Sequence, residues 1–406
     1  MQGIQSTSLL NFEVRKGSGV QISNALKVSP GALYFLMVNP IILNEGIKIL
    51  SSSLKRRLFG TKKYNGSAEE ICRSIIDCCW NKKGFFQVSA GHFNIFYIRD
   101  FGWCCDSLLK LGYEEKVKKT LDFALKHYKR SGKVTTCITK KGSCFDFPSY
   151  SVDSLPYLIK CLNMLDDDYL IVEYKDFLNS EISSFYSKVI DKSGLVKKNT
   201  HFSSMRDHVI RNSSCYDNCF VAMLKNEIKK SRILDNPFEK FDYEQLIKKN
   251  FWNGRFFYSD LNKHNFVASD ANIFPFYLGI FYDVSMLKSV IACIVRSGLD
   301  KPFPLKYTHK VHEEESFILL HKIIKNYETH SCWTHLGPIY IGLVEKVDKK
   351  KADTYIETYK NIIEENKNYL EVFDFKGKPF NTFFYYSDES MLWCVNILAF
   401  IKKPEI

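Results

Sequence analysis

Apolar residues recur at helical spacing along nearly the whole chain from residue 68 onward. Within each segment they return at every third or fourth position, which is the pattern of a helix that buries one face. Alternation of apolar and polar residues, which is typical of strands, is rare and confined to loops such as residues 256–259. We therefore predict helices over the segments 68–80, 100–111, 114–130, 154–165, 170–189, 217–230, 243–250, 271–281, 286–296, 314–327, 338–347, 351–368 and 388–400.

The predicted helices come in pairs joined by short turns, such as Leu111-Gly112-Tyr113. A superhelical repeat array would show a sequence period of roughly 34 to 47 residues, and no such period is visible. Paired helices without a repeat favour an all-α fold in which inner and outer helices form a toroid around one axis. Loops at one rim of a toroid form its pocket, so functional side chains are expected just before or after inner helices.

The first part of the chain is apolar and basic, unlike the helical part that follows it. Residues 61–67 have the composition of a linker. Ser67 is followed by Glu70 in a capping-box pattern, which predicts the start of a helix. We expect residues 1–65 to form a short N-terminal extension packed on the toroid, and residues 66–406 to form the toroid itself.

The composition supports a large globular domain. The chain has 406 residues, of which 45% are hydrophobic, and this content excludes a disordered chain. The formal net charge is +12, but the basic residues occur as short runs such as Lys55-Arg56-Arg57. We expect most of these runs on helix faces in contact with water. Because no nucleic-acid-binding motif is present, we expect no nucleic-acid partner.

The 13 cysteines are scattered, and several lie inside apolar helical segments. No two CxxC motifs, and no CxxC with an HxxxH, are present, so the sequence predicts no metal site and no cofactor. Reduced cysteines are typical of a cytoplasmic protein, and the N-terminus lacks the pattern of a secretory signal peptide. The most apolar stretch, residues 32–43, is too short for a membrane span.

A first candidate site follows an aromatic run over residues 92–98, which ends in Arg99-Asp100 at a predicted helix start. A guanidinium beside a carboxylate offers both donors and acceptors, and can hold vicinal hydroxyls of one sugar ring. Tyr97 and Trp103 flank this pair as further candidate substrate-binding residues. The alternative is an Asp that caps a helix beside a surface Arg.

A second candidate site lies near the C-terminus. Glu371 precedes Phe373-Asp374 and a turn at Gly377, and another predicted helix follows. Glu371 therefore lies in a loop before a predicted inner helix, where a toroid is expected to carry its functional side chains. The alternative is a solvent-exposed Glu at a helix end.

The two motifs resemble those of the glucoamylase family and its six-hairpin relatives. In that family an aromatic-rich loop ends in Arg-Asp, and a Glu before an aromatic residue and Asp is the general base. The resemblance covers residues 66–406 and implies an (α/α)₆ toroid with glycoside hydrolase activity. It also implies that Arg99 and Asp100 hold the sugar and that Glu371 is the base.

The general acid has two candidates. The stretch around Asp217 is similar to the Ser-Gly-aromatic-Asp-Asn motif of trehalases and processing α-glucosidases, whose Asp is the acid, although Cys215 stands where the Gly would be. In glucoamylases the acid lies about ten residues upstream, and counting back along the helix places Asp207 there. Neither position has the Trp-Glu-Glu of glucoamylases. The alternative role for each Asp is helix capping.

Three further polar-aromatic loops lead into apolar helices, as the loops of a toroid rim would. They contribute Asp153, Asp270, and Trp333 with His335 as candidate substrate-binding residues. The last loop resembles the Trp-then-Gly-Pro loop that lines the pocket in the six-hairpin superfamily. Its spacer, residues 334–336, is longer than the usual one.

Together these features predict an inverting, exo-acting glycoside hydrolase that acts on an α-glucosidic oligosaccharide or disaccharide. Asp217 or Asp207 would protonate the leaving group, and Glu371 would activate water. In such enzymes the two carboxyl groups lie roughly 6.5 to 9.5 Å apart, so that water fits between them and the sugar. The expected partner is a carbohydrate substrate.

Two other functions fit the same fold. A sugar epimerase would use paired histidines, and His201, His208 and His335 are candidates. A non-catalytic carbohydrate-binding toroid would need neither carboxylate for turnover.

Overall fold

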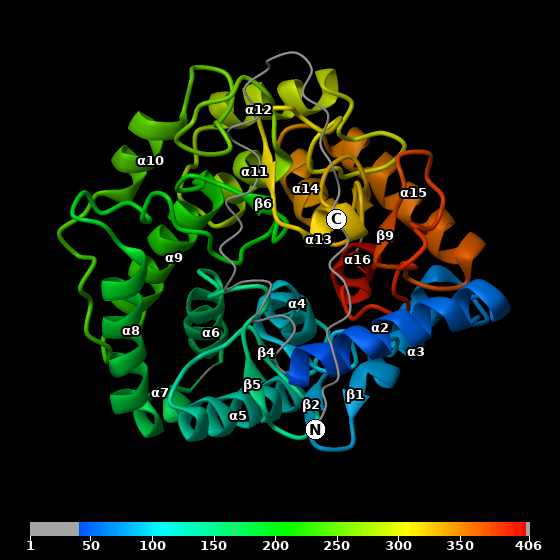
Figure 1. Cartoon of the computed structure of the whole chain (residues 1–406), viewed down its shortest axis with the longest axis horizontal. Helices are drawn as coiled ribbons and strands as arrows, with labels where there is room; N and C mark the ends of the chain where they lie inside the picture. The colour runs from blue at the N-terminus through cyan, green and yellow to red at the C-terminus, as the bar shows by residue number, and fades with distance from the viewer. Residues whose placement is uncertain (1–39, 166, 403–406) are drawn as a thin grey trace, which may run out of the picture.

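The computed structural model describes residues 40–165 and 167–402, and its main helices form two concentric rings around one axis (Figure 1). Inner and outer helices alternate along the chain, which confirms the predicted (α/α)₆ toroid. The inner ring consists of α4 (Ile98–Lys110), α6 (Ser154–Asn163), α9 (Cys215–Ser231), α11 (Ser269–Tyr277), α14 (Leu336–Glu345) and α16 (Cys394–Ile401). The outer ring consists of α3 (Ala68–Cys79), α5 (Glu114–Ser131), α8 (Lys175–Val189), α10 (Tyr243–Phe251), α12 (Val284–Arg296) and α15 (Lys349–Asn366).

The two rings differ in how their helices are buried. Nearly every residue of α14 is buried, because an inner helix is enclosed by neighbours on all sides. The outer helix α5 is amphipathic and keeps its lysines on the water side. The residues that α5 buries recur at three- and four-residue spacing: Val117, Thr120, Leu121, Ala124, Leu125 and Tyr128. This stripe is what the helical period of the sequence predicts.

One further helix, α2 (Pro40–Phe59), precedes the rings and crosses one face of the toroid (Figure 1, blue). It is joined to the rim, since the backbone N–H of Tyr386 donates to Ser53 Oγ at 3.0 Å. Residues 1–39 of the predicted extension lie outside the described residues. Helix α3 begins as predicted, with a capping box between Ser67 and Glu70.

Short antiparallel strands tie the rim loops together. They pair as β1-β2, β3-β4-β5, β6-β7 and β8-β9. The strands are β1 (Trp80–Asn81), β2 (Phe85–Phe86), β3 (Phe96–Tyr97), β4 (Cys137–Ile138), β5 (Cys144–Phe145), β6 (Val209–Ile210), β7 (Ser316–Phe317), β8 (Cys332–Trp333) and β9 (Val372–Phe373). The β8-β9 pair sets Trp333 opposite Val372, and so joins two of the candidate motifs directly.

The helix predicted over residues 314–327 is wrong for most of its length. Only α13 (Leu320–Ile323) is helical there. Residues of this segment instead make long-range contacts, because β7 pairs with β6 and Glu315 forms a buried ion pair with Arg206 at 2.6 Å. These contacts override the local helical period.

Three other predicted helices have different boundaries. The segment 170–189 is divided into α7 (Tyr169–Glu173) and α8, because the buried Tyr174 between them leaves the helical conformation. The segment 388–400 is helical only from Cys394, after Ser390 adopts a positive φ of 57°. Helix α11 starts at Ser269 and ends at Tyr277, before Gly279 with its positive φ of 67°.

Among residues 40–165 and 167–402, no helix combines the length and the apolar content that crossing a bilayer requires.

Packing between inner helices allows no side chain at Gly102 of α4. A Cβ there would lie 2.3 Å from a ring carbon of Tyr157, which is fully buried and has no room to move. We expect Gly102→Ala to destabilise the fold by about 1 to 3 kcal/mol, the usual cost of overpacking. Gly342→Ala is the matched control, since its Cβ would make an ordinary contact of 3.5 Å with Phe400. Melting temperatures measure the difference, and a Gly102→Ala protein as stable as the control would contradict the packing argument.

Candidate active site

A cavity of about 520 Å³ lies at the rim where α4, α14 and the loops before α9 and α16 meet. Most of the predicted site residues line it, although they come from distant parts of the sequence. Those that line it are Tyr97, Arg99, Asp100, Trp103, Asp207, Trp333, His335 and Glu371.

Glu371 is deeply buried, with 2% of the residue exposed. Its carboxylate accepts hydrogen bonds from the hydroxyls of Tyr327 and Tyr385, the second at 2.5 Å, and from the backbone N–H of Asp388 at 3.0 Å. Burial and the negative charge of Asp388 raise the pKa of Glu371 to about 7, and the three donors oppose this shift. Glu371 is therefore poised to exchange a proton near neutral pH.

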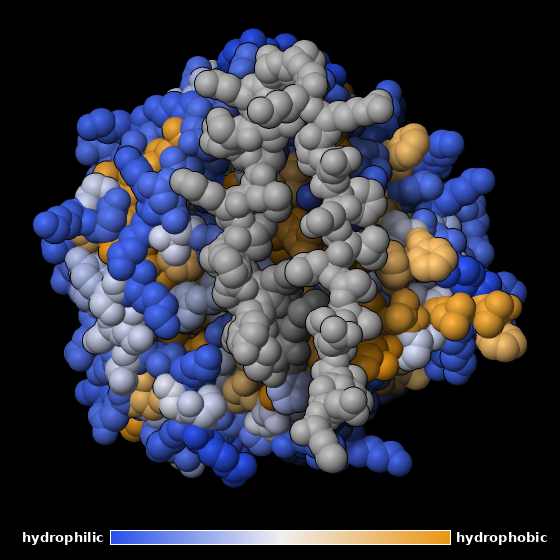
Figure 2. Space-filling model, viewed as in Figure 1, coloured by the Kyte–Doolittle hydropathy of each residue, from blue (hydrophilic) through white to orange (hydrophobic). Residues whose placement is uncertain are grey.

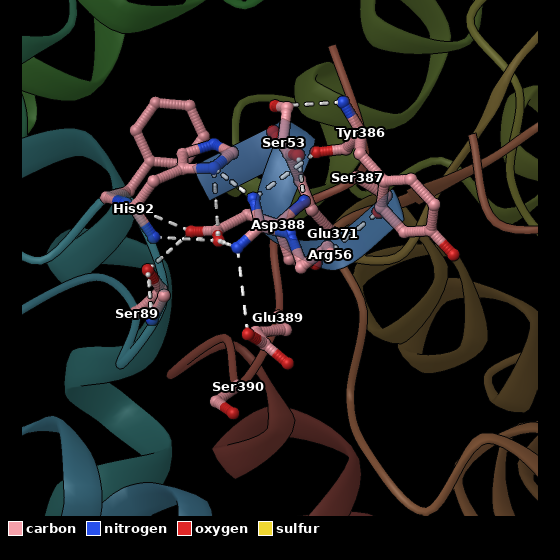
Figure 3. Close-up of polar contacts among 12 residues, drawn as sticks. Ser53, Arg56, Ser89, His92, Glu371, Tyr386, Ser387, Asp388, Glu389 and Ser390 are labelled. Atoms are coloured by element: carbon pink, nitrogen blue, oxygen red, sulfur yellow. Dashed lines mark hydrogen bonds and ion pairs between the residues drawn. The ribbon is translucent and has the colours of Figure 1, made fainter. Parts of the chain in front are cut away.

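A buried polar network behind Glu371 fixes the loop that carries Asp388 (Figure 3). The Asp388 carboxylate accepts from Ser89 Oγ at 2.5 Å and from the backbone N–H of His92 at 2.8 Å. Arg56 of α2 forms an ion pair with it at 3.1 Å. Burial raises the pKa of Asp388, but the nearby His92 and Arg56 outweigh burial and lower it overall. The network holds Asp388 as an anion and orients its backbone N–H, from which Glu371 accepts a hydrogen bond.

Asp207 lines the cavity, and 20% of its side chain is exposed. Its oxygens accept from Ser203 Oγ at 2.6 Å, from the backbone N–H of Ser204 at 2.9 Å and from Arg99 Nη1 at 3.2 Å. Arg99 also donates through Nε to Asp153 at 2.6 Å. Arg99 therefore acts as a clamp that sets the position of Asp207 at the cavity surface.

Glu328 is a cavity carboxyl that the sequence analysis missed. It is 4% exposed, lines the cavity and accepts from the backbone N–H of His208 at 2.6 Å. Burial and the negative charge of Asp207 raise the pKa of Glu328 to about 8. The signal that could have found it is the polar-aromatic stretch between Tyr327 and Trp333, which leads into an inner helix as the other site loops do.

Aromatic rings form another part of the cavity lining. Trp103 and His335 stack with their ring centroids 4.3 Å apart, and Trp393 Nε1 donates to Asp100 at 3.0 Å. Burial raises the pKa of Asp100 to about 7. Flat rings beside a carboxyl are suited to stacking a sugar and bonding its hydroxyls.

The other predicted site residues lie outside the cavity lining that the described residues form. Asp153 supports Arg99 and accepts from Tyr216 at 2.7 Å. Asp270 forms a buried ion pair with Arg211 at 2.6 Å. Asp217 lies in the first turn of α9, where its backbone N–H bonds the Ser214 cap, and burial raises its pKa to about 7.

No family model matches the chain, and no curated protein sequence matches it. Solved structures do match, at low sequence identity. The chain is similar to a rhamnosidase from Klebsiella oxytoca with rhamnose bound, at 10% identity and a TM-score of 0.56, over 84% of this chain and 66% of the other. It is also similar to a bacterial glucoamylase complexed with acarbose, at 12% identity and a TM-score of 0.54, over 82% of this chain and 54% of the other.

A third similar structure, a GH63 mannosylglycerate hydrolase from Thermus thermophilus in complex with Tris, has 10% identity and a TM-score of 0.55. That match covers 83% of this chain and the whole of the other. All three are glycoside hydrolases, and the chain has the six-hairpin toroid fold that it shares with them.

Proposed function

We propose that this chain is an inverting, exo-acting glycoside hydrolase that cleaves an α-glucosidic bond. The observation that carries the proposal is the meeting of Asp207 and Glu371 in one cavity. The two carboxylates come from loops far apart in the sequence, and Asp100 lines the same cavity. An inverting glycosidase needs such a pair, one to protonate the leaving oxygen and one to activate water on the opposite face of the sugar.

In this proposal Glu371 is the general base. Tyr327 and Tyr385 orient its carboxylate by donating to it, and burial raises its pKa to about 7. A base of this pKa removes a proton from water effectively at neutral pH.

Asp207 is the proposed general acid, because it is the candidate whose side chain lies at the cavity surface. The acid must bring a proton, and its neighbour Glu328 has a pKa raised to about 8. Glu328 therefore holds a proton at neutral pH, beside the Asp207 carboxyl. Asp207 would pass that proton to the leaving oxygen.

The terminal sugar would contact Asp100 and the stacked rings of Trp103 and His335. Arg99 lines the cavity, but its guanidinium already bonds Asp153 and Asp207. Its proposed role is therefore to position the acid.

The test is the anomer of the released sugar. The protein is incubated with maltooligosaccharides, trehalose and simple α-glucosides, and proton NMR follows the anomeric signals before mutarotation. Early release of the β-anomer is the expected result. Early release of the α-anomer would show retention and overturn the inverting mechanism.

The epimerase alternative has one observation in its favour, since His208 and His335 both line the cavity. Burial lowers the pKa of His208 to about 3 and that of His335 well below its usual value, so both are neutral at neutral pH and both are weak bases. Incubation of a free sugar in D₂O separates the functions. Deuterium incorporation at a ring carbon without any glycoside cleavage would establish the epimerase.

The hydroxyl of Tyr385 provides a test of the base. Tyr385→Phe removes a donor that stabilises the ionised form of Glu371, so the pKa of Glu371 should rise. Because the ionised form is active, kcat/KM increases with pH through this pKa, and the ascending limb should move to higher pH in the variant. Tyr386→Phe is the control, since its hydroxyl makes no bond to Glu371 (Figure 3). A limb that stays at the wild-type pH in Tyr385→Phe would exclude Glu371 as the titrating base.

A further inference from the structure

The cavity changes character from its interior to its opening. The interior carboxyls Glu371 and Glu328 are 2% and 4% exposed. Other residues that line the same cavity are large, apolar and about half exposed, which places them at the opening: Leu43, Ile47 and Leu50 of α2, Ile323 of α13, and Phe384. Figure 2 shows apolar surface along the part of the face where Figure 1 draws α2.

These side chains are an unusual wall for a site that receives a second sugar. Leucine and isoleucine offer neither donors nor acceptors for hydroxyls. Contact with them would desolvate the hydroxyls of a leaving sugar without replacing their hydrogen bonds. The alkyl chain of an alcohol leaving group loses no hydrogen bonds by such contact and is stabilised by burial.

The polar residue that α2 contributes to the lining does not alter this chemistry. Glu45 lines the cavity, but its carboxylate forms an ion pair with Lys48 at 2.6 Å, within the same helix. The apolar wall is also fixed in place, because α2 is joined to the rim through Arg56 and Ser53.

We propose that the leaving group of the substrate is an alkyl alcohol, which keeps the glycosidic oxygen and receives the proton of the acid, so that the substrate is a glycolipid-like α-glucoside and not an oligosaccharide. The inference rests on the proposed hydrolase function and adds the class of its leaving group. The sugar would occupy the carboxyl-lined interior, and the chain would lie along α2 and leave through the opening. The alkyl glycoside could reach the site as a free amphiphile or from a bilayer.

The test compares methyl, butyl, hexyl and octyl α-glucosides below their critical micelle concentrations with maltose and maltotriose. Burial of one methylene is worth up to about fourfold in binding, so kcat/KM should rise by about twofold or more per methylene along the series. Octyl glucoside should also exceed both maltooligosaccharides. Equal kcat/KM values along the alkyl series would overturn the proposal. A higher kcat/KM for maltotriose than for octyl glucoside would overturn it as well.

Two leucines of α2 form a matched pair of positions. Leu50 lines the cavity at 48% exposure, and Leu54 is 51% exposed on the same helix but is not part of the lining. Leu50→Gln should reduce the rise of kcat/KM with alkyl chain length, while Leu54→Gln should leave that rise unchanged. The same loss in both variants would show a general effect on α2 and overturn the assignment.

A binding measurement separates this proposal from the hydrolase function. Trp103, Trp333 and Trp393 line the cavity, so tryptophan fluorescence reports occupancy without turnover. Absence of hydrolysis with affinity that rises along the alkyl series would reject the hydrolase and retain the alkyl site. Hydrolysis with an affinity that stays the same along the alkyl series would retain the hydrolase and reject the alkyl site. Hydrolysis of octyl glucoside only when it is held in phosphatidylcholine vesicles would identify the bilayer as its source, and hydrolysis of the free monomer would identify the amphiphile in solution.

Discussion

Replacement of Glu371 by Gln is expected to lower kcat by roughly 10²- to 10⁴-fold, the usual contribution of a general base. Gln has the same shape and keeps an oxygen that accepts from Tyr385, but its amide does not remove a proton from water. Sugar binding should change little, because the proposed mechanism assigns Glu371 to the attacking water and assigns the sugar to other groups.

Turnover is measured by sugar release at saturating substrate, and binding by tryptophan fluorescence with the same substrate. Glu357→Gln is a matched control, since Glu357 lies on the outer helix α15 and is 58% exposed in its side chain. If Glu371→Gln retained wild-type kcat, the hydrolase mechanism would fail, and a carbohydrate-binding role would take its place.

The architecture could be predicted from the sequence because each ring imposes its own pattern. An outer helix such as α5 must bury a stripe, and an inner helix such as α14 is apolar on all sides. Both patterns are local, and so is the Ser67 capping box. The helix prediction for residues 314–327 was wrong because the structure of this segment depends on β6, about a hundred residues earlier in the chain.

The candidate site was predictable where a motif carries its own chemistry. Arg99, Asp100 and Glu371 line the cavity as the motifs indicated. Glu328 has no such motif, and its role arises only because the fold brings it beside Asp207 and the backbone of His208. The polar-aromatic stretch around it marks the loop as a candidate, but it does not single out Glu328 from the other polar residues of that loop.

The basic run Lys55-Arg56-Arg57 shows a similar limit. A solvated face was predicted for such runs, and Arg56 is an exception at 4% exposure. Its partner Asp388 lies more than three hundred positions away, so no local pattern reveals the pair. An arginine among other basic residues becomes structural only when the fold supplies a buried anion.

Asp207→Asn is expected to lower kcat by roughly 10²- to 10⁴-fold on substrates whose leaving oxygen needs a proton. The amide keeps the size of the carboxyl and its bonds from Ser203 and Ser204, but it has no acidic proton to give. With α-glucosyl fluoride, whose leaving group needs little protonation, the variant should recover most of the wild-type rate. Glu371→Gln should remain slow on the same substrate, because water still has to be activated.

Asp217→Asn is the decisive comparison, since the sequence motif favours Asp217 and the cavity favours Asp207. Asp217 lies in the first turn of α9, outside the cavity lining of the described residues. Its variant should therefore keep kcat within about tenfold of wild type, and its losses should be the same for glucosyl fluoride and for poor leaving groups. A large loss in Asp217→Asn that glucosyl fluoride rescues, together with an active Asp207→Asn, would reverse the assignment. The acid would then be the residue that the trehalase-like motif indicates, and the loop before α9 would have to rearrange on substrate binding to bring it into the cavity.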